Sequence, residues 1–134
     1  MSVGVLLVTH GKLGRFFLET MADMLSEKLP LQADVLEVRR VQDTNVLLRQ
    51  GHRMIERLDA GSGVLILTDA YGSTPSNIAS KLGAADNTVV VAGVNLPMLV
   101  RIFNYASYGL NELARAAVEG GQRGIVVCPG TENN

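Results

Sequence analysis

The fold is decided by residues 5–25, which read VLLVTHGKLGRFFLETMADML. The segment continues an apolar run, Val3–Val8, that predicts a buried parallel strand. A polar turn at residues 9–11 follows, and helical spacing of apolar residues begins near Leu13. His10 therefore stands at the carboxyl end of a strand, where open α/β sheets place their functional residues.

His10 itself allows several kinds of chemistry. Its unperturbed pKa lies nearest neutrality among side chains, so an imidazole here can act as a base, a nucleophile or a metal ligand. A histidine that only caps the turn fits this position equally well. The other strand ends of the sheet are needed to choose between these interpretations.

Strand and helix patterns alternate along the whole chain. The expected strands are Val3–Val8, Ala33–Val38, Gly63–Asp69, Thr88–Ala92 and a short last strand, Gly124–Cys128. The expected helices are Leu13–Leu29, Asn45–Leu58, one that starts near Pro75, a short one after Pro97, and Leu110–Glu119 closed by Gly120 and Gly121. This alternation predicts an α/β fold, a single doubly wound, mostly parallel sheet of four strands flanked by helices. We expect one domain over 1–134, with a flexible tail over 129–134.

Composition narrows the class of protein. The chain has 134 residues, of which 47% are hydrophobic and 19% charged, as expected for one well-buried domain. A formal net charge of −1 gives no electrostatic footprint for nucleic acid or an anionic membrane. The apolar run at the start is too short to span a bilayer and lacks a basic flank. We expect four methionines in the core: Met21, Met24, Met54 and Met98.

Cys128 is the only cysteine, which excludes an intrachain disulfide and favours a cytoplasmic location. Its apolar neighbours predict a buried thiol. His52 lies on a helix beside Gln50 and Arg53, and we interpret it as a surface histidine. The pair Arg39-Arg40 follows the second strand and is interpreted as solvated charge that could meet an acidic partner.

Polar residues follow three strands that share one rim of the predicted sheet. The first strand is followed by Thr9, His10 and Gly11, the third ends at Asp69, and the fourth is followed by Asn95. A buried carboxylate is unfavourable unless it is paired, and a histidine on the neighbouring strand is a suitable partner. The carboxylate of Asp69 would accept from one ring nitrogen and leave the other free as a nucleophile.

The stretch Gly72-Ser73-Thr74 opens a helix at the same rim. Backbone N–H groups at a helix start bind phosphate without lysine or arginine. A nucleophilic imidazole, an orienting carboxylate and an anion cradle together suggest a phosphoryl carrier. Taken singly, Asp69 could only cap a turn, and Ser73 or Thr74 could only satisfy helix N–H groups.

The chain resembles the IIA component of the mannose-type (mannose/fructose/sorbose) phosphoenolpyruvate:sugar phosphotransferase system. The matching stretches are VLLVTHGKLG around His10, GVLILTDAYGSTPSNIAS around Asp69 and VAGVNLPMLV over residues 91–100. They occur in order, and with the helices between them they cover nearly the whole chain.

The resemblance implies that the carrier HPr phosphorylates His10, which passes the group to a IIB component, and that Asp69 bonds the active imidazole. The resemblance places Gly72, Ser73 and Thr74 at the phosphate. The strand ends add Gly11 beside the phosphate and a rim made of Thr9, Tyr71, Asn95 and Pro97. Such a protein uses no cofactor or metal and binds neither the sugar nor nucleic acid. It serves the membrane components IIC and IID indirectly. The resemblance also implies a homodimer in which the last strand is swapped.

The chain departs from mannose-specific members after the aspartate, where Tyr71 and Ser73 replace a tryptophan and a glycine. The sugar is therefore left open. Three other functions are considered. A stand-alone regulatory IIA protein would signal through the phosphorylation state of His10. A small tetrapyrrole metal chelatase also begins with a strand and a His-Gly turn, but it needs a second metal-binding histidine, and His52 is in mid-helix. A flavodoxin-like nucleotide binder would need a Gly-rich phosphate loop, for which GKLG is too short.

Overall fold

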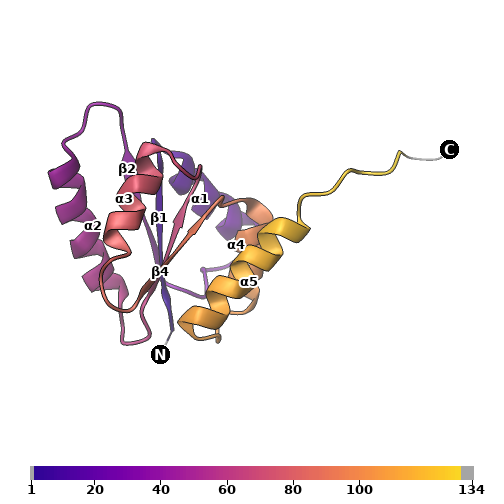
Figure 1. Cartoon of the computed structure of the whole chain (residues 1–134). Helices are drawn as coiled ribbons and strands as arrows, with labels where there is room; N and C mark the ends of the chain where they lie inside the picture. Colours follow the sequence, from indigo (N-terminus) through magenta and orange to yellow (C-terminus); the bar gives the residue numbers. More distant parts are fainter. Residues whose placement is uncertain (1, 131–134) are drawn as a thin grey trace.

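A parallel sheet of four strands, in the order β2-β1-β3-β4, runs through the middle of the molecule (Figure 1). The computed structural model describes residues 2–130. The strands are β1 (Gly4–His10), β2 (Ala33–Val38), β3 (Val64–Thr68) and β4 (Thr88–Ala92), and each neighbouring pair is parallel. The predicted four-stranded parallel sheet is confirmed. The second strand, which has the most alternating sequence, is an edge strand as expected.

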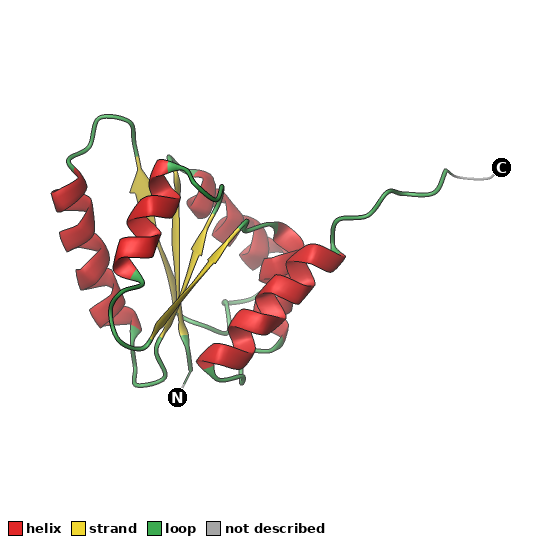
Figure 2. Ribbon diagram, viewed as in Figure 1, coloured by secondary structure: helices red, strands yellow, loops and turns green. Residues whose placement is uncertain are grey.

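Five helices cover the two faces of the sheet. They are α1 (Leu13–Leu25), α2 (Thr44–Leu58), α3 (Thr74–Leu82), α4 (Leu96–Asn104) and α5 (Leu110–Arg123). Helices α2 and α3 lie on one face, and α1, α4 and α5 lie on the other (Figure 2). No helix among the described residues is long and apolar enough to cross a membrane.

The central strands are buried on both faces, which explains their continuous apolar sequence. In β1, Leu6 and Val8 join the apolar cluster under α2 and α3, while Val5 and Leu7 join the cluster under α1, α4 and α5. Burying each such side chain contributes roughly 1.5–3 kcal/mol. The two clusters therefore hold both helix layers to the same strand, the one that ends at His10.

Strands are added to the sheet on both sides of β1. From β1 the connection through α1 leads outward to β2, whereas β3 and β4 are added on the other side of β1. The carboxyl ends of β1 and β3 therefore flank the point where the strand order reverses, which is where open α/β sheets bind ligands. The topology places the ends of these two strands side by side.

Helix α1 is shorter than predicted. The apolar spacing predicts a helix to Leu29, but α1 ends at Leu25 because Ser26 adopts a left-handed conformation with φ of 56° and donates its N–H to Asp23 O. Met24, expected in the core, is exposed on the last turn. Helix termination by a single left-handed residue is not visible in hydrophobic periodicity.

Helix α5 is longer than predicted. Gly120 and Gly121 were expected to close it, but both lie inside the helix, which continues to Arg123. Both glycines are buried against α4, where a Cβ on Gly120 would lie 2.5 Å from Arg101 Cβ and one on Gly121 3.1 Å from Met98 Cε. These glycines allow the two helices to approach closely and do not end the helix.

The expected last strand, Gly124–Cys128, is not formed within this chain. Past α5 the segment leaves the body of the molecule as an extended arm (Figure 1), and its residues are exposed. A strand requires a hydrogen-bonded neighbour, and no other described strand lies beside the arm. Cys128, predicted to be buried, is exposed in the single chain for the same reason. Of the predicted tail 129–134, residues 131–134 lie outside the described residues.

Smaller differences concern where helices begin. Asp43 caps α2 by accepting the N–H of Asn45, as the sequence allows. Helix α3 starts at Thr74, one residue before the predicted proline, and α4 starts at Leu96, before Pro97. In both helices the proline occupies the first turn, where its missing N–H is not needed.

Candidate functional site

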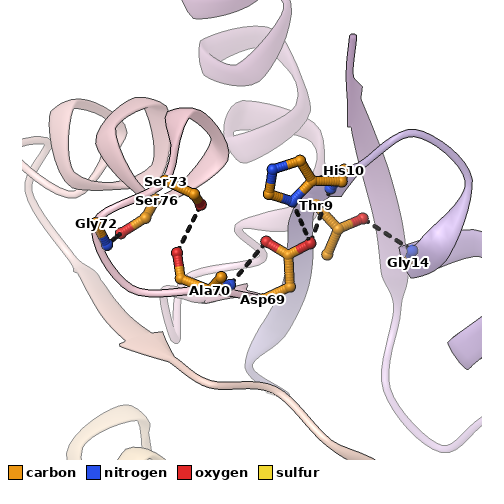
Figure 3. A network of polar contacts seen from close by, with 8 residues as sticks. All are labelled: Thr9, His10, Gly14, Asp69, Ala70, Gly72, Ser73 and Ser76. Atoms are coloured by element: carbon orange, nitrogen blue, oxygen red, sulfur yellow. Dashed lines mark hydrogen bonds and ion pairs between the residues drawn. The ribbon is translucent and has the colours of Figure 1, made fainter. Parts of the chain in front are cut away.

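The site is built from the ends of β1 and β3. Val8 of β1 is paired with Thr68 of β3, so His10 and Asp69 follow adjacent positions on neighbouring strands. His10 Nδ1 lies 2.7 Å from Asp69 Oδ2, although 59 residues separate them (Figure 3). The predicted pairing of this imidazole with this carboxylate is present.

Asp69 is held by three hydrogen bonds. Its Oδ2 also accepts the backbone N–H of His10 at 3.0 Å, and its Oδ1 accepts the backbone N–H of Ala70 at 2.9 Å. Partial burial pushes the pKa of Asp69 upward, but the hydrogen bonds from His10 and Ala70 outweigh it and hold that pKa below its ordinary value. Asp69 is therefore ionised at neutral pH.

The ionised carboxylate decides the tautomer of His10. A carboxylate can only accept, so Nδ1 of the neutral ring carries the hydrogen and Nε2 keeps its lone pair. Nε2 faces away from Asp69 (Figure 3). The side chain of His10 is 56% exposed and that of Asp69 only 11%. The reactive nitrogen is thus accessible while the group that orients it is shielded.

Thr9 and Gly11 shape the turn that carries His10. Thr9 is buried, and its Oγ1 accepts the N–H of Gly14 at 2.8 Å, which ties the strand end to the start of α1. Gly11 has φ of 48°, and its N–H donates to Val38 O at 3.0 Å. Thr9 was predicted on the rim of the site, but its hydroxyl lies beneath the rim and positions the turn.

The predicted phosphate-binding amides differ in availability. Gly72 N–H donates to Ser76 Oγ at 3.2 Å (Figure 3), and Ser73 N–H donates to Ala70 O at 3.1 Å. Ser73 Oγ also donates to Ala70 O, so this residue precedes α3 without capping it through its side chain. Among the described residues, the N–H groups of Thr74 and Ser76 have no acceptor. Pro75 between them has no N–H.

The remaining predicted rim residues are Tyr71, Asn95 and Pro97, and they belong to two different segments of the chain. Tyr71 is almost fully exposed in the loop after Asp69. Asn95 caps α4, with its Oδ1 accepting the N–H of Met98 at 2.9 Å and its Nδ2 donating to Gly121 O at 3.2 Å. Asn95 and Pro97 follow β4, which is separated from β1 by β3. They lie at the start of α4, beside α5.

A cavity of about 300 Å³ opens beside the imidazole. Its lining residues are His10, Val38, Arg39, Arg40, Thr74 and Pro75. Sequence reasoning assigned Arg39 and Arg40 to solvent and did not place them in the site. The sequence held a signal for their position, since both arginines directly follow the predicted second strand. In the structure Val38, the last residue of β2, is paired with His10.

Other candidate groups lie elsewhere. His52 is exposed on α2, as interpreted from its neighbours. Within residues 2–130, no group of three or more His, Cys, Asp or Glu side chains is arranged to hold a metal ion. The chemistry that the described residues support is nucleophilic attack by Nε2 of His10, with Asp69 stabilising the cationic ring that results.

Comparison with known proteins identifies relatives over almost the whole chain. A family model described as "PTS system fructose IIA component" matches residues 4–118. The "PTS system mannose-specific EIIAB component" of Escherichia coli K12 is 32% identical over 130 residues, which cover 93% of this chain and 39% of the relative. The chain thus spans well under half of that relative's length.

Solved structures show the same fold. The mannose/sorbose specific IIA subunit of the phosphotransferase system from Enterococcus faecalis superposes with a TM-score of 0.84 at 24% identity, covering 100% of both chains. The PTS IIA protein associated with the fucose utilization operon from Streptococcus pneumoniae gives a TM-score of 0.78 at 23% identity, covering 95% of this chain and 96% of that one. From the family match over residues 4–118 and the 32% identity, the chain belongs to the mannose-type IIA family of the phosphoenolpyruvate:sugar phosphotransferase system.

Proposed function

We propose that this chain is a phosphohistidine carrier that accepts a phosphoryl group from HPr on His10 and passes it to a IIB component. The observation that carries the proposal is the hydrogen bond of 2.7 Å between His10 Nδ1 and Asp69 Oδ2. It gives the ring one committed nitrogen and one exposed nitrogen. A carrier needs the exposed nitrogen to take up and release the phosphoryl group. It needs the committed nitrogen to hold the ring in one orientation during both steps.

The proposed step exchanges one P–N bond for another. Nε2 of His10 forms a bond to phosphorus while the P–N bond of the phosphohistidine in the donor breaks, and the electron pair of that bond returns to the donor imidazole. His10 keeps its Nδ1 hydrogen and becomes an imidazolium carrying a phosphoryl group. The carboxylate of Asp69 faces the new positive charge across 2.7 Å. Transfer to a IIB component is the same step in the other direction.

The start of α3 supports the transferred group. The free N–H groups of Thr74 and Ser76 lie at the positive end of a helix, and Thr74 lines the cavity beside His10. Of the amides expected to face the phosphate, the proposal retains Thr74. Those of Gly11, Gly72 and Ser73 already donate within the chain.

The test is phosphorylation with purified components. Incubation with phosphoenolpyruvate, Enzyme I and HPr is expected to add one acid-labile phosphate to the intact protein. His10→Ala should abolish the added mass, and His52→Ala, which removes the other histidine, should leave it unchanged. Absence of the phosphate in the wild type, or its survival in His10→Ala, rejects the proposal.

We further propose that the arm Gly124–Cys128 pairs with the β4 edge of a second copy. β4 is the outer strand of the described sheet, and its residues Thr88, Val89 and Val90 are only partly buried. The arm presents three exposed apolar residues with strand propensity, Ile125, Val126 and Val127. An open edge and an unpaired apolar segment complement each other in a swapped homodimer.

The place of the carrier in the cell follows from the same proposal. We expect a cytoplasmic protein that meets HPr and a IIB component and serves membrane IIC and IID components only indirectly. A pull-down with the unphosphorylated protein is expected to recover HPr and IIB. Recovery of a kinase or a transcription regulator instead assigns the chain to the regulatory alternative, in which His10 phosphorylation is the signal.

A further inference from the structure

The cavity beside His10 is lined on one side by the residues that follow β2. Arg39 and Arg40 contribute to it together with Thr74 and Pro75 at the start of α3. A group attached to Nε2 of His10 that extended into this cavity would meet the start of α3 and residues Arg39 and Arg40. Arg39 and Arg40 differ in whether their guanidinium groups are free to bind such a group.

Arg39 is already committed to a carboxylate. Its guanidinium donates to Glu37 Oε1 at 2.7 Å, and Arg15 Nε donates to Glu37 Oε2 at 2.9 Å. Hydrogen bonds from Arg15 and Arg39 hold the pKa of Glu37 below its ordinary value, so Glu37 stays ionised and keeps both partners. Glu37 of β2 therefore links Arg15 of α1 to Arg39.

Arg40 has no hydrogen bond or ion pair with any described residue. The backbone of the turn that carries it is held by the N–H of Arg39, which donates to Gln42 Oε1 at 2.8 Å. Arg40 is thus the uncommitted cation of the cavity. Lys12 is also unpaired among the described residues, but it does not line the cavity.

A phosphoryl group on His10 needs a positive neighbour. It would carry close to two negative charges next to the ionised Asp69, which opposes them. The start of α3 provides fewer amides than a typical phosphate loop, because Gly72 and Ser73 already donate and Pro75 has no N–H. A guanidinium matches the geometry of phosphate oxygens through two parallel N–H donors.

We propose that the guanidinium of Arg40 binds the phosphoryl group carried by His10 across this cavity. This rests on the proposed function of His10 as the phosphorylated residue. Arg40 is then a ligand of the transferring group, which it stabilises on the carrier and in the transition state of transfer. In this role Arg40 contacts the phosphoryl group and not the donor or acceptor protein. The role therefore differs from one in which Arg40 binds an acidic surface of HPr or a IIB component.

The decisive measurement uses the isolated phosphoprotein. The wild type, Arg40→Ala, Arg40→Lys and the control Arg53→Ala are each phosphorylated on His10, and the phosphoryl group is titrated by ³¹P NMR in the absence of partners. Arg53 is an exposed α2 residue without a described partner, so its loss removes the same charge away from the cavity. A nearby cation lowers the pKa of an anion by about one unit or more. Arg40→Ala is therefore expected to raise the phosphoryl pKa by about that amount, with Arg40→Lys intermediate and Arg53→Ala unchanged.

A second measurement follows transfer. Because a hydrogen bond to a charged group is worth about tenfold or more in an equilibrium constant, Arg40→Ala should slow phosphorylation of His10 about tenfold with HPr as donor. The same loss is expected with phosphoramidate, a small donor that has no docking surface. His10→Ala corrects for labelling elsewhere.

The outcomes separate the two proposals. If the wild type gains no phosphate on His10 from HPr, the proposed function fails. If it does, but Arg40→Ala leaves the phosphoryl pKa and the phosphoramidate rate unchanged, the inference about Arg40 is overturned and the carrier function stands. Slower transfer from HPr alone, with an unchanged phosphoryl pKa, also overturns it and assigns Arg40 to the docking of an acidic partner. Equal thermal unfolding of the variants shows that these comparisons concern folded protein.

Discussion

A single oxygen of Asp69 holds His10 at two points: Oδ2 accepts the backbone N–H at 3.0 Å and the ring Nδ1 at 2.7 Å. The carboxylate therefore fixes both the end of β1 and the orientation of the imidazole. Because the two bonds share one acceptor, the ring cannot turn freely while the strand end stays in place. The direction of the other ring nitrogen, Nε2, is thus set by the junction of β1 and β3.

Replacing the carboxylate tests this relationship. Asp69→Asn keeps the shape but removes the charge that stabilises the imidazolium, and it no longer selects the tautomer with hydrogen on Nδ1. We expect phosphoryl transfer from HPr to fall about 10- to 100-fold, because hydrogen bonds to charged groups contribute roughly 1.5–3 kcal/mol. Single-turnover phosphorylation followed by mass spectrometry measures this. An unchanged rate contradicts the assigned role of Asp69.

The same residue gives a pH dependence of stability. The pKa of Asp69 is lowered in the folded protein from an ordinary value of 3.8, so its contribution is fully present above that value and is lost as pH falls through the lower, folded pKa. The wild type should exceed Asp69→Asn in free energy of unfolding at neutral pH, and the difference should shrink below the ordinary pKa. Urea unfolding at a series of pH values measures both proteins, and a difference that grows on acidification contradicts the assignment.

The packing of α5 on α4 gives a prediction about stability alone. A Cβ at Gly120 would meet Arg101 Cβ at 2.5 Å, and that atom cannot retreat because it is attached to the backbone. Overpacking costs about 1–3 kcal/mol, against a gain of about 1 kcal/mol in helix propensity. Gly120→Ala is therefore expected to lower the free energy of unfolding by about 1 kcal/mol, the middle of a net range of roughly 0–2 kcal/mol.

Gly121 provides the matched control for that substitution. Its Cβ would meet Met98 Cε, the far end of a flexible side chain, at 3.1 Å. It would meet Met98 Cβ at 3.3 Å, a much less severe overlap than the 2.5 Å approach at Gly120. Gly121→Ala should therefore be close to neutral in urea unfolding. A larger loss for Gly121→Ala than for Gly120→Ala contradicts the described contacts.

The proposed dimer is tested on the arm. Val127 is 97% exposed in the single chain, and Val41 in the turn after β2 is equally exposed. If the arm pairs with a second copy, Val127→Asp buries a charge in the interface and shifts the protein toward monomer, while Val41→Asp does not. Sedimentation velocity over a concentration series distinguishes these outcomes. A wild type that stays monomeric throughout refutes the pairing.

Much of the site could be predicted because it follows from topology. Parallel strands carry their carboxyl ends to one rim, so a histidine after the first strand and an aspartate after the third were expected to meet. That expectation required only the order of apolar runs and turns. The roles of Gly120 and Gly121 could not be predicted in the same way, since a pair of glycines favours both a helix end and a close helix contact. The presence of α4 against them makes the difference.

The sequence by itself determined the alternation of strands and helices, the single parallel sheet and the pairing of His10 with Asp69, because burial patterns and turn residues are local properties of the chain. Only the tertiary structure decided which groups around the imidazole are free. The amides of Gly72 and Ser73 are committed to Ser76 and Ala70, whereas Arg40 has no partner among the described residues. Whether an N–H or guanidinium group is free depends on which acceptors lie close to it. Those neighbours are set only when the chain folds.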